Sequence, residues 1–236
     1  MCIIGIDIGG TKIRGILWNG KRVIRGREFP TPKNRSDLEN RLLALVPQLA
    51  GEERIDGIGI GAAGIVEKRT LLFSPNIPYI RNFDFSSLWH RSIRLRLDND
   101  ARCFARAEFL SGEGRGSKNL FALTIGTGIG RAYGSQGRII KIKRFEFPEQ
   151  WEKRYQRLRD SRDYGKLAEF LGEKLAGLMK PFTPEVVVIG GGVIERHRFF
   201  PMLQLTLKSH GLNCPIRRSS LGKNAVTIGA AMLVSK

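Results

Sequence analysis

One pattern occurs twice in this chain and limits its fold more than any other feature: an apolar strand, a glycine turn and an antiparallel hairpin. In the first copy the opening strand ends at Gly9-Gly10, and the hairpin turns at Asn19-Gly20, a dipeptide typical of tight hairpins. In the second copy the glycine turn is Gly126-Thr127-Gly128 and the hairpin lies at Gly134 to Gly137. The strands are expected at residues 3–8, 12–18, 21–29 and 120–125.

When the two copies are overlaid, their strands and glycines stay in phase. Asp7 matches Thr124, Gly9 matches Gly126, Gly10 matches Thr127 and Gly20 matches Gly137. This agreement predicts a structural duplication within an α/β fold. The two halves are expected to be an N-terminal lobe at residues 1–114 and a C-terminal lobe at 115–236.

The remaining elements follow from periodicity and from start and stop signals. Ser36 and Glu39 form a capping-box pattern before leucines at helical spacing, and Pro47 is expected to end or kink that helix. Further strands are expected at residues 55–60, 93–97 and 186–189, and further helices at 101–112, 164–180 and 224–234.

Composition indicates a globular protein with one extreme property, a formal charge of +18 in 236 residues. The charge favours an anionic partner such as a nucleotide, although a solvated basic surface explains it equally well. Nucleic acid is not the expected ligand, because no nucleic-acid-binding motif accompanies the charge. The three cysteines, an odd number and widely spaced, fit reduced thiols and no zinc site. With no apolar run of membrane length and no signal peptide, the protein is expected to be cytoplasmic.

The two glycine turns are candidate phosphate sites, because backbone N–H groups at glycine can approach an anion closely. The first offers Gly9, Gly10, the Thr11 hydroxyl and the Lys12 ammonium, with Asp7 placed to hold hydrated Mg²⁺. Gly126, Thr127 and Gly128 offer a second set of donors without an acid. Each turn alone is also what a tight hairpin requires, but two at matching positions favour a site that grips a triphosphate.

Two further segments carry candidate chemistry. Gly190-Gly191-Gly192 follows a buried strand and leaves room for a base or ribose on the backbone, although a close-packed turn has the same sequence. Asp98-Asn99-Asp100 stands where a strand becomes a helix. A carboxylate there can accept the proton of a substrate hydroxyl, and one of these residues can instead cap the helix.

Taken together, the motifs resemble those of the ROK family (repressors, open reading frames, kinases), over nearly the whole chain and in the family's order. The segments that carry the resemblance are Asp7 to Lys12, Ser74 to Pro78, Asn99-Asp100-Ala101, Ala107-Glu108, Gly126 to Gly130, Pro184 to Gly192 and Gly229-Ala230-Ala231.

The resemblance implies a two-lobed, duplicated ribonuclease-H-like (actin-like ATPase) fold with a nucleotide cleft between the lobes. It implies transfer of the ATP γ-phosphoryl to a sugar hydroxyl, with ATP and Mg²⁺ required and a homodimer by analogy. Asp100 would be the general base, with Asn76, Asn99 and Gly64 at the acceptor and Asp7 at the metal. The turns at 9–12 and 126–128 would hold phosphates, and Gly191 and Gly192 would border the adenosine.

This chain departs from the family pattern in one region. The chain lacks the family's Glu-x-x-His pair, which binds sugar hydroxyls, and also lacks the family's zinc loop. His90, His197 and His210 all lie outside this region. Glu149 falls near the expected acid and Glu152 near the expected histidine, so Glu149 is a candidate acceptor ligand.

Several functions therefore stay open at this point. A hexose such as glucose is the family's default acceptor. The basic residues from Arg138 to Arg144 raise the alternative of another or an anionic sugar or polyol, although a solvated basic hairpin explains them better. A catalytically weak sugar or ATP sensor is the non-enzymatic alternative, and a sheet-based nucleic-acid binder rests on charge alone.

Overall fold

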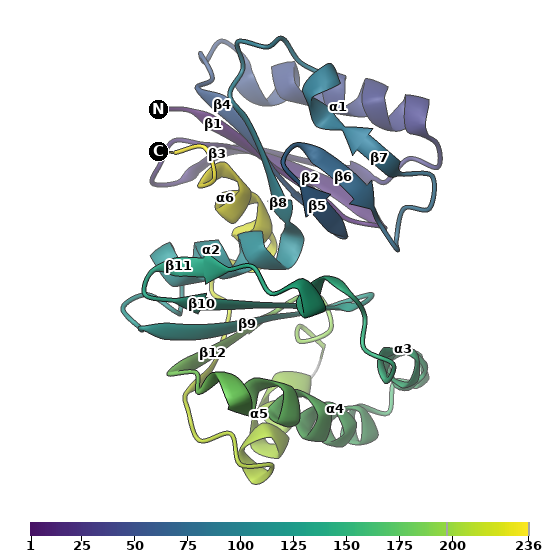
Figure 1. Ribbon diagram of the computed structural model, residues 1–236, viewed down its shortest axis with the longest axis vertical. Helices are drawn as coiled ribbons and strands as arrows, with labels where there is room; N and C mark the ends of the chain where they lie inside the picture. The colour runs from purple at the N-terminus through teal and green to yellow at the C-terminus, as the bar shows by residue number, and fades with distance from the viewer. Residues whose placement is uncertain (197, 236) are drawn as a thin grey trace. The chain divides into compact units, whose positions relative to one another are not determined.

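The computed structural model describes residues 1–196 and 198–235, so His197 lies outside the described part. The chain forms two compact units, which are described separately (Figure 1). Unit 1 comprises Met1–Ala107 and Asn224–Lys236, and unit 2 comprises Glu108–Lys223. This division differs from the expected boundary after Gly114. The C-terminal helix returns to the first sheet, and the long helix α2 (Asp100–Ser111) contributes to both units.

Unit 1 is built on a five-stranded mixed sheet with the order β3-β2-β1-β4-β8. A second sheet of three antiparallel strands, β5-β6-β7, follows β4 in the chain and was not expected. The strands are β1 (Ile3–Ile8), β2 (Lys12–Trp18), β3 (Val23–Pro30), β4 (Gly57–Ala62), β5 (Ile65–Glu67), β6 (Thr70–Phe73), β7 (Arg81–Asp84) and β8 (Leu95–Asn99). The other elements are α1 (Arg35–Ala50), a 3₁₀ turn at Phe85–Ser87, and α6 (Ala225–Ala231), which follows a 3₁₀ turn at Gly222–Asn224.

Side chains alternate between the two faces of β1, and each face packs against a different helix. Ile4, Ile6 and Ile8 join the leucines of α1 in one core. Ile3 on the other face packs with residues of α6, and this second face also carries Gly5 and Asp7. The backbone of α6 lies so close that a Cβ on Gly5 would meet Thr227 O at 2.0 Å. Glycine on this strand therefore permits helix-on-sheet contact at the level of the backbone.

Two details of α1 differ from the sequence expectation. The N-cap is Asn34 and not Ser36, because Asn34 Oδ1 accepts the Asp37 N–H at 2.9 Å and Asn34 Nδ2 donates to Asp37 Oδ2 at 2.8 Å. Pro47 does not end the helix, which continues to Ala50. Since proline lacks only its own N–H donor, the last turn still closes through the Gly51 N–H bonded to Pro47 O at 2.9 Å.

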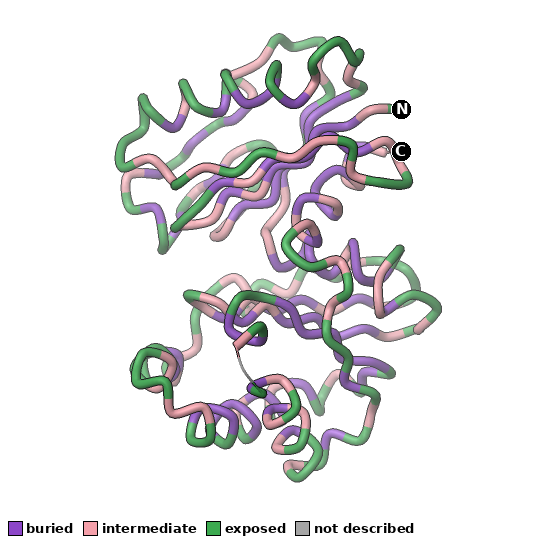
Figure 2. The backbone as a smooth tube through the Cα atoms, turned by 180° about the vertical axis from the view of Figure 1, so that it is seen from behind, coloured by how far each residue is buried: buried purple, intermediate pink, exposed green. Residues whose placement is uncertain are grey.

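Unit 2 repeats the sheet order of unit 1, with β11-β10-β9-β12-β13. Its strands are β9 (Asn119–Ile125), β10 (Ile129–Ser135), β11 (Arg138–Ile140), β12 (Val186–Gly190) and β13 (Ile216–Arg218). Its helices are α3 (Glu152–Ser161), α4 (Tyr164–Met179) and α5 (Phe199–Ser209), with 3₁₀ turns at Lys143–Glu146 and Lys180–Phe182. Both α4 and α5 pack on one face of β9, where Phe121, Leu123 and Ile125 lie in the buried core. The central strands of both sheets are buried along most of their length (Figure 2).

The strand registers confirm the duplication at the level of single residues. Asp7 lies opposite Gly61 on the parallel neighbour β4, and Thr124 lies opposite Gly190 on the parallel neighbour β12. The first glycine turn spans the four residues between the paired Ile8 and Ile13. The second spans only the three between the paired Ile125 and Ile129, so it is one residue shorter.

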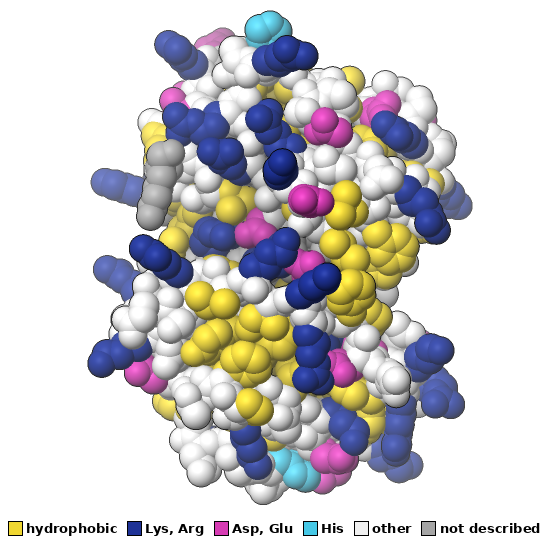
Figure 3. All heavy atoms as spheres, in the orientation of Figure 1, with side chains coloured by type: hydrophobic (Ala, Val, Ile, Leu, Met, Phe, Trp, Pro, Cys, Tyr) yellow, Lys and Arg dark blue, Asp and Glu magenta, His cyan; other side chains and the backbone are white. Residues whose placement is uncertain are grey.

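Within the described part of the chain, no helix combines the length and the apolar character needed to cross a bilayer. Lys and Arg side chains are scattered over the face drawn in Figure 3 and are not gathered in one area. The basic stretch from Arg138 to Arg144 is partly neutralised, because Lys141 pairs with Glu146 at 3.8 Å and Arg144 with Glu149 at 2.9 Å.

Candidate active site

The junction of β8 and α2 assigns a separate role to each residue of Asp98-Asn99-Asp100. Asn99 is the residue that caps the helix, since its Oδ1 accepts the N–H groups of Ala101 at 3.0 Å and Arg102 at 3.3 Å. Its Nδ2 donates one hydrogen to Gly64 O at 3.1 Å. The amide carries a second N–H, which can donate to a hydroxyl of a bound molecule.

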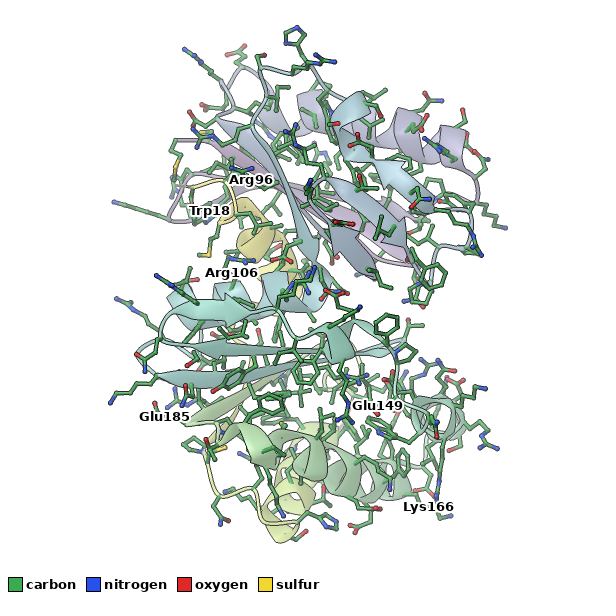
Figure 4. All side chains as sticks on the ribbon, viewed as in Figure 1. Trp18, Arg96, Arg106, Glu149, Lys166 and Glu185 are labelled. Atoms are coloured by element: carbon green, nitrogen blue, oxygen red, sulfur yellow. The ribbon has the colours of Figure 1, made fainter. Side chains whose placement is uncertain are left out.

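Asp98 binds two arginines of α2 and so stabilises the position of this helix. Its Oδ1 pairs with Arg102 Nε at 2.5 Å and its Oδ2 with Arg106 Nη2 at 3.0 Å, one and two turns along the helix. Figure 4 labels Arg106 on this helix. Both oxygens of the Asp98 carboxylate therefore face guanidinium groups, and this carboxylate serves the fold.

Of the two carboxylates in this segment, Asp100 is the one with no cationic partner among the ion pairs of the described residues. Its Oδ1 accepts the Ala101 N–H at 2.9 Å. Burial raises the pKa of Asp100 above the usual value for an aspartate. A desolvated carboxylate at a helix N-terminus, free of a salt bridge, is suited to accept a proton.

Asp7 extends this acidic site from the end of β1. Burial, together with the charge of Asp100, raises the pKa of Asp7 to about 8, and Lys12 and Arg14 only partly oppose the shift. Two interacting carboxyl groups that form no direct ion pair among the described residues fit a divalent cation, whose charge would favour both ionised forms. Over residues 1–196 and 198–235 no cluster of three or more potential ligand side chains is found. An ion here would thus keep water and phosphate ligands, as Mg²⁺ commonly does.

A series of close contacts and one hydrogen bond links four residues of unit 1 that the sequence predicted as site residues. A Cβ on Gly10 would meet Asn76 Cβ at 2.4 Å, so the first glycine turn lies against the loop that carries Asn76. Gly64 has φ +140° and lies against Phe73 O, two residues before Pro75, while its own carbonyl accepts from Asn99. The structure therefore brings Gly10, Asn76, Gly64 and Asn99 together.

The rest of the first glycine turn serves partly structural needs. Gly9 N–H donates to Lys12 O at 3.1 Å and Thr31 Oγ1 donates to Gly9 O at 2.6 Å. Thr11 and Lys12 are exposed, and the Lys12 ammonium pairs with Glu28 on β3 at 3.2 Å. Lys12 would have to leave this exposed ion pair, which is worth little, to contact a phosphate.

The second glycine turn has glycines that the protein itself does not explain. A Cβ on Gly126 would meet no described atom within 4 Å, and one on Gly128 would meet only Glu152 Oε2 at 4.0 Å. Neither glycine has a positive φ. Gly192 is open in the same way. Neither backbone strain nor packing requires glycine at these positions, and glycine there leaves the backbone open to close approach by a ligand.

Gly191 differs from Gly192 and links the two glycine segments of unit 2. It has φ +100°, and a Cβ there would meet Ile125 O at 2.4 Å. Ile125 is the residue just before the second glycine turn, and its carbonyl also accepts the Val193 N–H at 3.0 Å. The sequence-predicted phosphate turn and adenosine-bordering glycines are thus adjacent in space.

Glu149 lies in a four-residue ionic cluster that sequence reasoning did not anticipate. Its Oε1 accepts from Arg144 Nη2 at 2.9 Å and lies 3.7 Å from Arg131 Nη1, while Glu152 pairs with Arg131 Nη2. Figure 4 labels Glu149 beside the start of α3. Arg131 is buried on β10, and this burial lowers its pKa to about 10. Glu152, which was expected near the position of the family's histidine, is therefore the partner of a buried arginine.

Two more residues near the second glycine turn were missed. Tyr155 Oη donates to Gly126 O at 2.5 Å, and Arg159 Nη1 donates to Thr127 O at 2.7 Å. Both lie on α3. This helix was not predicted, because its sequence has too few apolar residues to show helical periodicity. The only available signal was the pair Tyr155 and Leu158, three residues apart among charged side chains.

Several known proteins that are similar to this chain are named as sugar kinases. A beta-glucoside kinase of Klebsiella pneumoniae is 28% identical, over 98% of this chain and 95% of that relative. A glucokinase of Streptomyces coelicolor is 32% identical, over 54% of this chain and 41% of that relative.

Solved structures show the same fold over the whole chain. A ROK family glucokinase from Streptomyces griseus, in complex with glucose and AMPPNP, has a TM-score of 0.87 at 22% identity and covers 99% of both chains. A ROK hexokinase from Thermus thermophilus has a TM-score of 0.76 at 26% identity, over 98% of this chain and 97% of that one.

The model of the ROK family matches residues 3–142 and 159–236, and therefore includes both glycine turns and the β8–α2 junction. The stretch it leaves unmatched, 143–158, contains Glu149, Glu152 and Tyr155. The protein has the duplicated, actin-like α/β fold of these kinases, and it belongs to the ROK family.

Proposed function

We propose that this protein is an ATP-dependent sugar kinase that transfers the γ-phosphoryl group of ATP to a hydroxyl of a hexose, with glucose as the first acceptor to test. The observation that carries the proposal is the division of roles at the β8–α2 junction. Asn99 caps the helix and Asp98 holds two arginines, whereas Asp100 is desolvated and has no cationic partner among the described ion pairs. The names of the relatives, glucokinase and beta-glucoside kinase, support the class of reaction.

In the proposed mechanism, Asn76, Asn99 and the Gly64 segment orient the acceptor. Asp100 accepts the proton of the attacking hydroxyl as the phosphoryl group transfers. A general base typically contributes about 10²- to 10⁴-fold to the rate. Most of the remaining acceleration comes from positioning and from neutralising phosphate charge.

The nucleotide is proposed to bind through the glycine segments. Thr127 N–H and Gly128 N–H of the second glycine turn would donate to phosphate oxygens, and Gly191 and Gly192 would border the adenosine. Gly9 to Lys12 would supply further donors. Asp7 would hold Mg²⁺ through water, and the ion would supply charge neutralisation of the phosphates.

The acceptor's identity depends on the segment that departs from the family. Glu149 is proposed as an acceptor ligand, in competition with its contacts to Arg144 and Arg131. Because these four charges balance, the cluster itself does not favour an anionic acceptor over a neutral one. Other sugars, amino sugars, polyols and sugar phosphates therefore belong in the test.

The proposal is tested by incubating the protein with MgATP and glucose and analysing the products by mass spectrometry. Formation of a hexose phosphate together with an equal amount of ADP supports the proposal. If ATP binds but neither glucose nor any other acceptor is phosphorylated, the protein is a sensor and not a kinase.

A further inference from the structure

The second glycine turn, Gly126-Thr127-Gly128, is held by side chains of α3 through its carbonyl oxygens. Tyr155 Oη donates to Gly126 O at 2.5 Å. Arg159 Nη1 donates to Thr127 O at 2.7 Å and to Gly126 O at 3.3 Å. The third carbonyl, Gly128 O, accepts the N–H of Gly126 at 3.0 Å. Every carbonyl of the turn therefore has a donor within unit 2.

These bonds also determine where the turn's N–H groups point. In a trans peptide the C=O and the following N–H lie in one plane and point in opposite directions. The peptide that carries Gly126 O also carries Thr127 N–H, and the peptide that carries Thr127 O also carries Gly128 N–H. Fixing the two oxygens toward α3 turns the two donors away from it, and prevents the carbonyls from facing an anion.

The sequence of the turn by itself restrains its backbone little. Two of its three residues are glycines without packing constraints, and glycine allows the backbone more conformations than any other residue. The supporting side chains are themselves fixed. Tyr155 is fully buried, and Arg159 pairs with Asp160 at 2.8 Å and has its guanidinium 5.8 Å from the Tyr155 ring.

One of these two side chains lies outside the segments that the ROK family model matches. Tyr155 belongs to residues 143–158, which the family model does not match, and Arg159 immediately follows that stretch. Arg159 also contributes a positive charge next to the turn. Its side chain is 17% exposed, so the charge is less screened than that of a fully exposed arginine.

We propose that Tyr155 and Arg159 are positioning residues that keep Thr127 N–H and Gly128 N–H directed at the phosphates of the nucleotide. The inference rests on the proposed function, since it presumes that this turn binds phosphate. It adds a mechanism by which two side chains of helix α3 support nucleotide binding.

The test compares three variants with a matched control on the same helix. Tyr155→Phe removes only the hydroxyl, Arg159→Gln removes the charge and the donor geometry, and Arg159→Lys keeps the charge. Arg157→Gln is the control, because Arg157 is exposed and the change in net charge equals that of Arg159→Gln. Dissociation constants for AMPPNP, ADP and adenosine are measured by calorimetry, with thermal unfolding as a check on folding.

Tyr155→Phe is expected to weaken AMPPNP binding by about 3- to 10-fold, the usual effect of one lost hydrogen bond, and Arg159→Gln by about 10-fold or more. Adenosine, which lacks phosphates, is expected to bind all variants within about twofold of wild type. Arg159→Lys is expected to recover part of the affinity that Arg159→Gln loses. In steady-state assays the loss is expected in KM for ATP and not in KM for the acceptor.

The outcomes separate this inference from the proposed function. If wild-type protein binds AMPPNP but Tyr155→Phe and Arg159→Gln bind it as tightly as Arg157→Gln, the positioning role is wrong and the kinase proposal stands. If adenosine affinity falls as much as AMPPNP affinity, the side chains support unit 2 generally and the positioning role is again wrong. If wild-type protein binds no phosphate-bearing nucleotide, both proposals fail.

Discussion

Asp98 and Asp100 stand two residues apart at the β8–α2 junction, and their carboxylates have opposite surroundings. Asp98 is bound by Arg102 and Arg106. Asp100 accepts a backbone N–H, is raised in pKa by burial, and itself raises the pKa of Asp7. The short segment thus separates a carboxylate that maintains the structure from one available for chemistry, and the two can be distinguished by substitution.

Substitution of Asp100 by Asn should reduce turnover by about 10²- to 10⁴-fold, because the amide cannot accept the proton of the attacking hydroxyl. Since Asp100 has no described ion pair to lose, thermal unfolding should change little. The measurement is kcat with saturating MgATP and acceptor. Turnover close to that of wild type would show that Asp100 is not the base.

Substitution of Asp98 by Asn should mainly lower stability, whereas substitution of Asp100 should mainly lower turnover. The change at Asp98 removes the carboxylate that Arg102 and Arg106 share, and should lower the free energy of unfolding by about 2–3 kcal/mol, less than for a fully buried pair. Urea unfolding gives this value. Glu39→Gln, which breaks the exposed Arg35–Glu39 pair of α1, serves as control and should cost under about 0.5 kcal/mol. Equal stability of the two variants would contradict a structural role for Asp98.

Substitution of Gly126 or Gly128 by Ala should raise KM for ATP by about tenfold or more while leaving stability equal or up to about 1 kcal/mol higher. Each added methyl meets open space in the protein but would stand where a phosphate approaches. Gly177→Ala in α4, where a Cβ also meets no described atom, is the control and should leave KM unchanged. An unchanged KM in the Gly126 and Gly128 variants would remove the argument for a phosphate site at this turn.

Glu108 should make the stability of the protein depend on pH. Its buried carboxyl accepts from Ser219 Oγ and, at 2.9 Å, from the Glu113 N–H, yet burial raises its pKa above the ordinary value. The pKa of Glu108 is therefore higher in the folded than in the unfolded protein. Its contribution to the free energy of unfolding is complete below the pKa of the unfolded state, about 4.3, and is lost as pH rises through the pKa of the folded state.

Glu108→Gln, which resembles the protonated acid, should therefore become increasingly more stable than wild type as pH rises from about 4 toward neutrality. Tm measured for both proteins across this range gives the difference, with exposed Glu52→Gln as control. A difference that is constant with pH, or that grows toward acid, would contradict the assignment.

Much of the fold could be predicted because the duplicated pattern is local and strong. Strand periodicity and the glycine turns predicted β1, β2, β9 and β12 nearly to the residue, and the match of Asp7 with Thr124 is confirmed by their parallel partners. The helix 101–112 was also expected, since the carboxamide and carboxylates before it are typical N-cap residues.

The features that were missed depend on tertiary contacts. The strands β5 to β7 are short, and only their packing defines them as a sheet. The return of α6 to unit 1 depends on its contact with Gly5, some 220 residues away in sequence. The role of Glu152 could not be predicted because its partner, the buried Arg131, lies on a different element. Likewise, the residue types at this junction alone did not separate the roles of Asp98 and Asp100. The family resemblance favoured Asp100 as the base, and the structure adds the two arginines that pair with Asp98.

The most direct test of the central claim is ADP release from MgATP over a panel of neutral sugars, amino sugars, polyols and sugar phosphates, with wild type and Asp100→Asn side by side. We expect release that depends on a hexose acceptor and that falls by about 10²-fold or more in the variant, while AMPPNP binding is retained. Acceptor-independent release, or equal release by the two proteins, would contradict the assignment of Asp100 as the base of a sugar kinase.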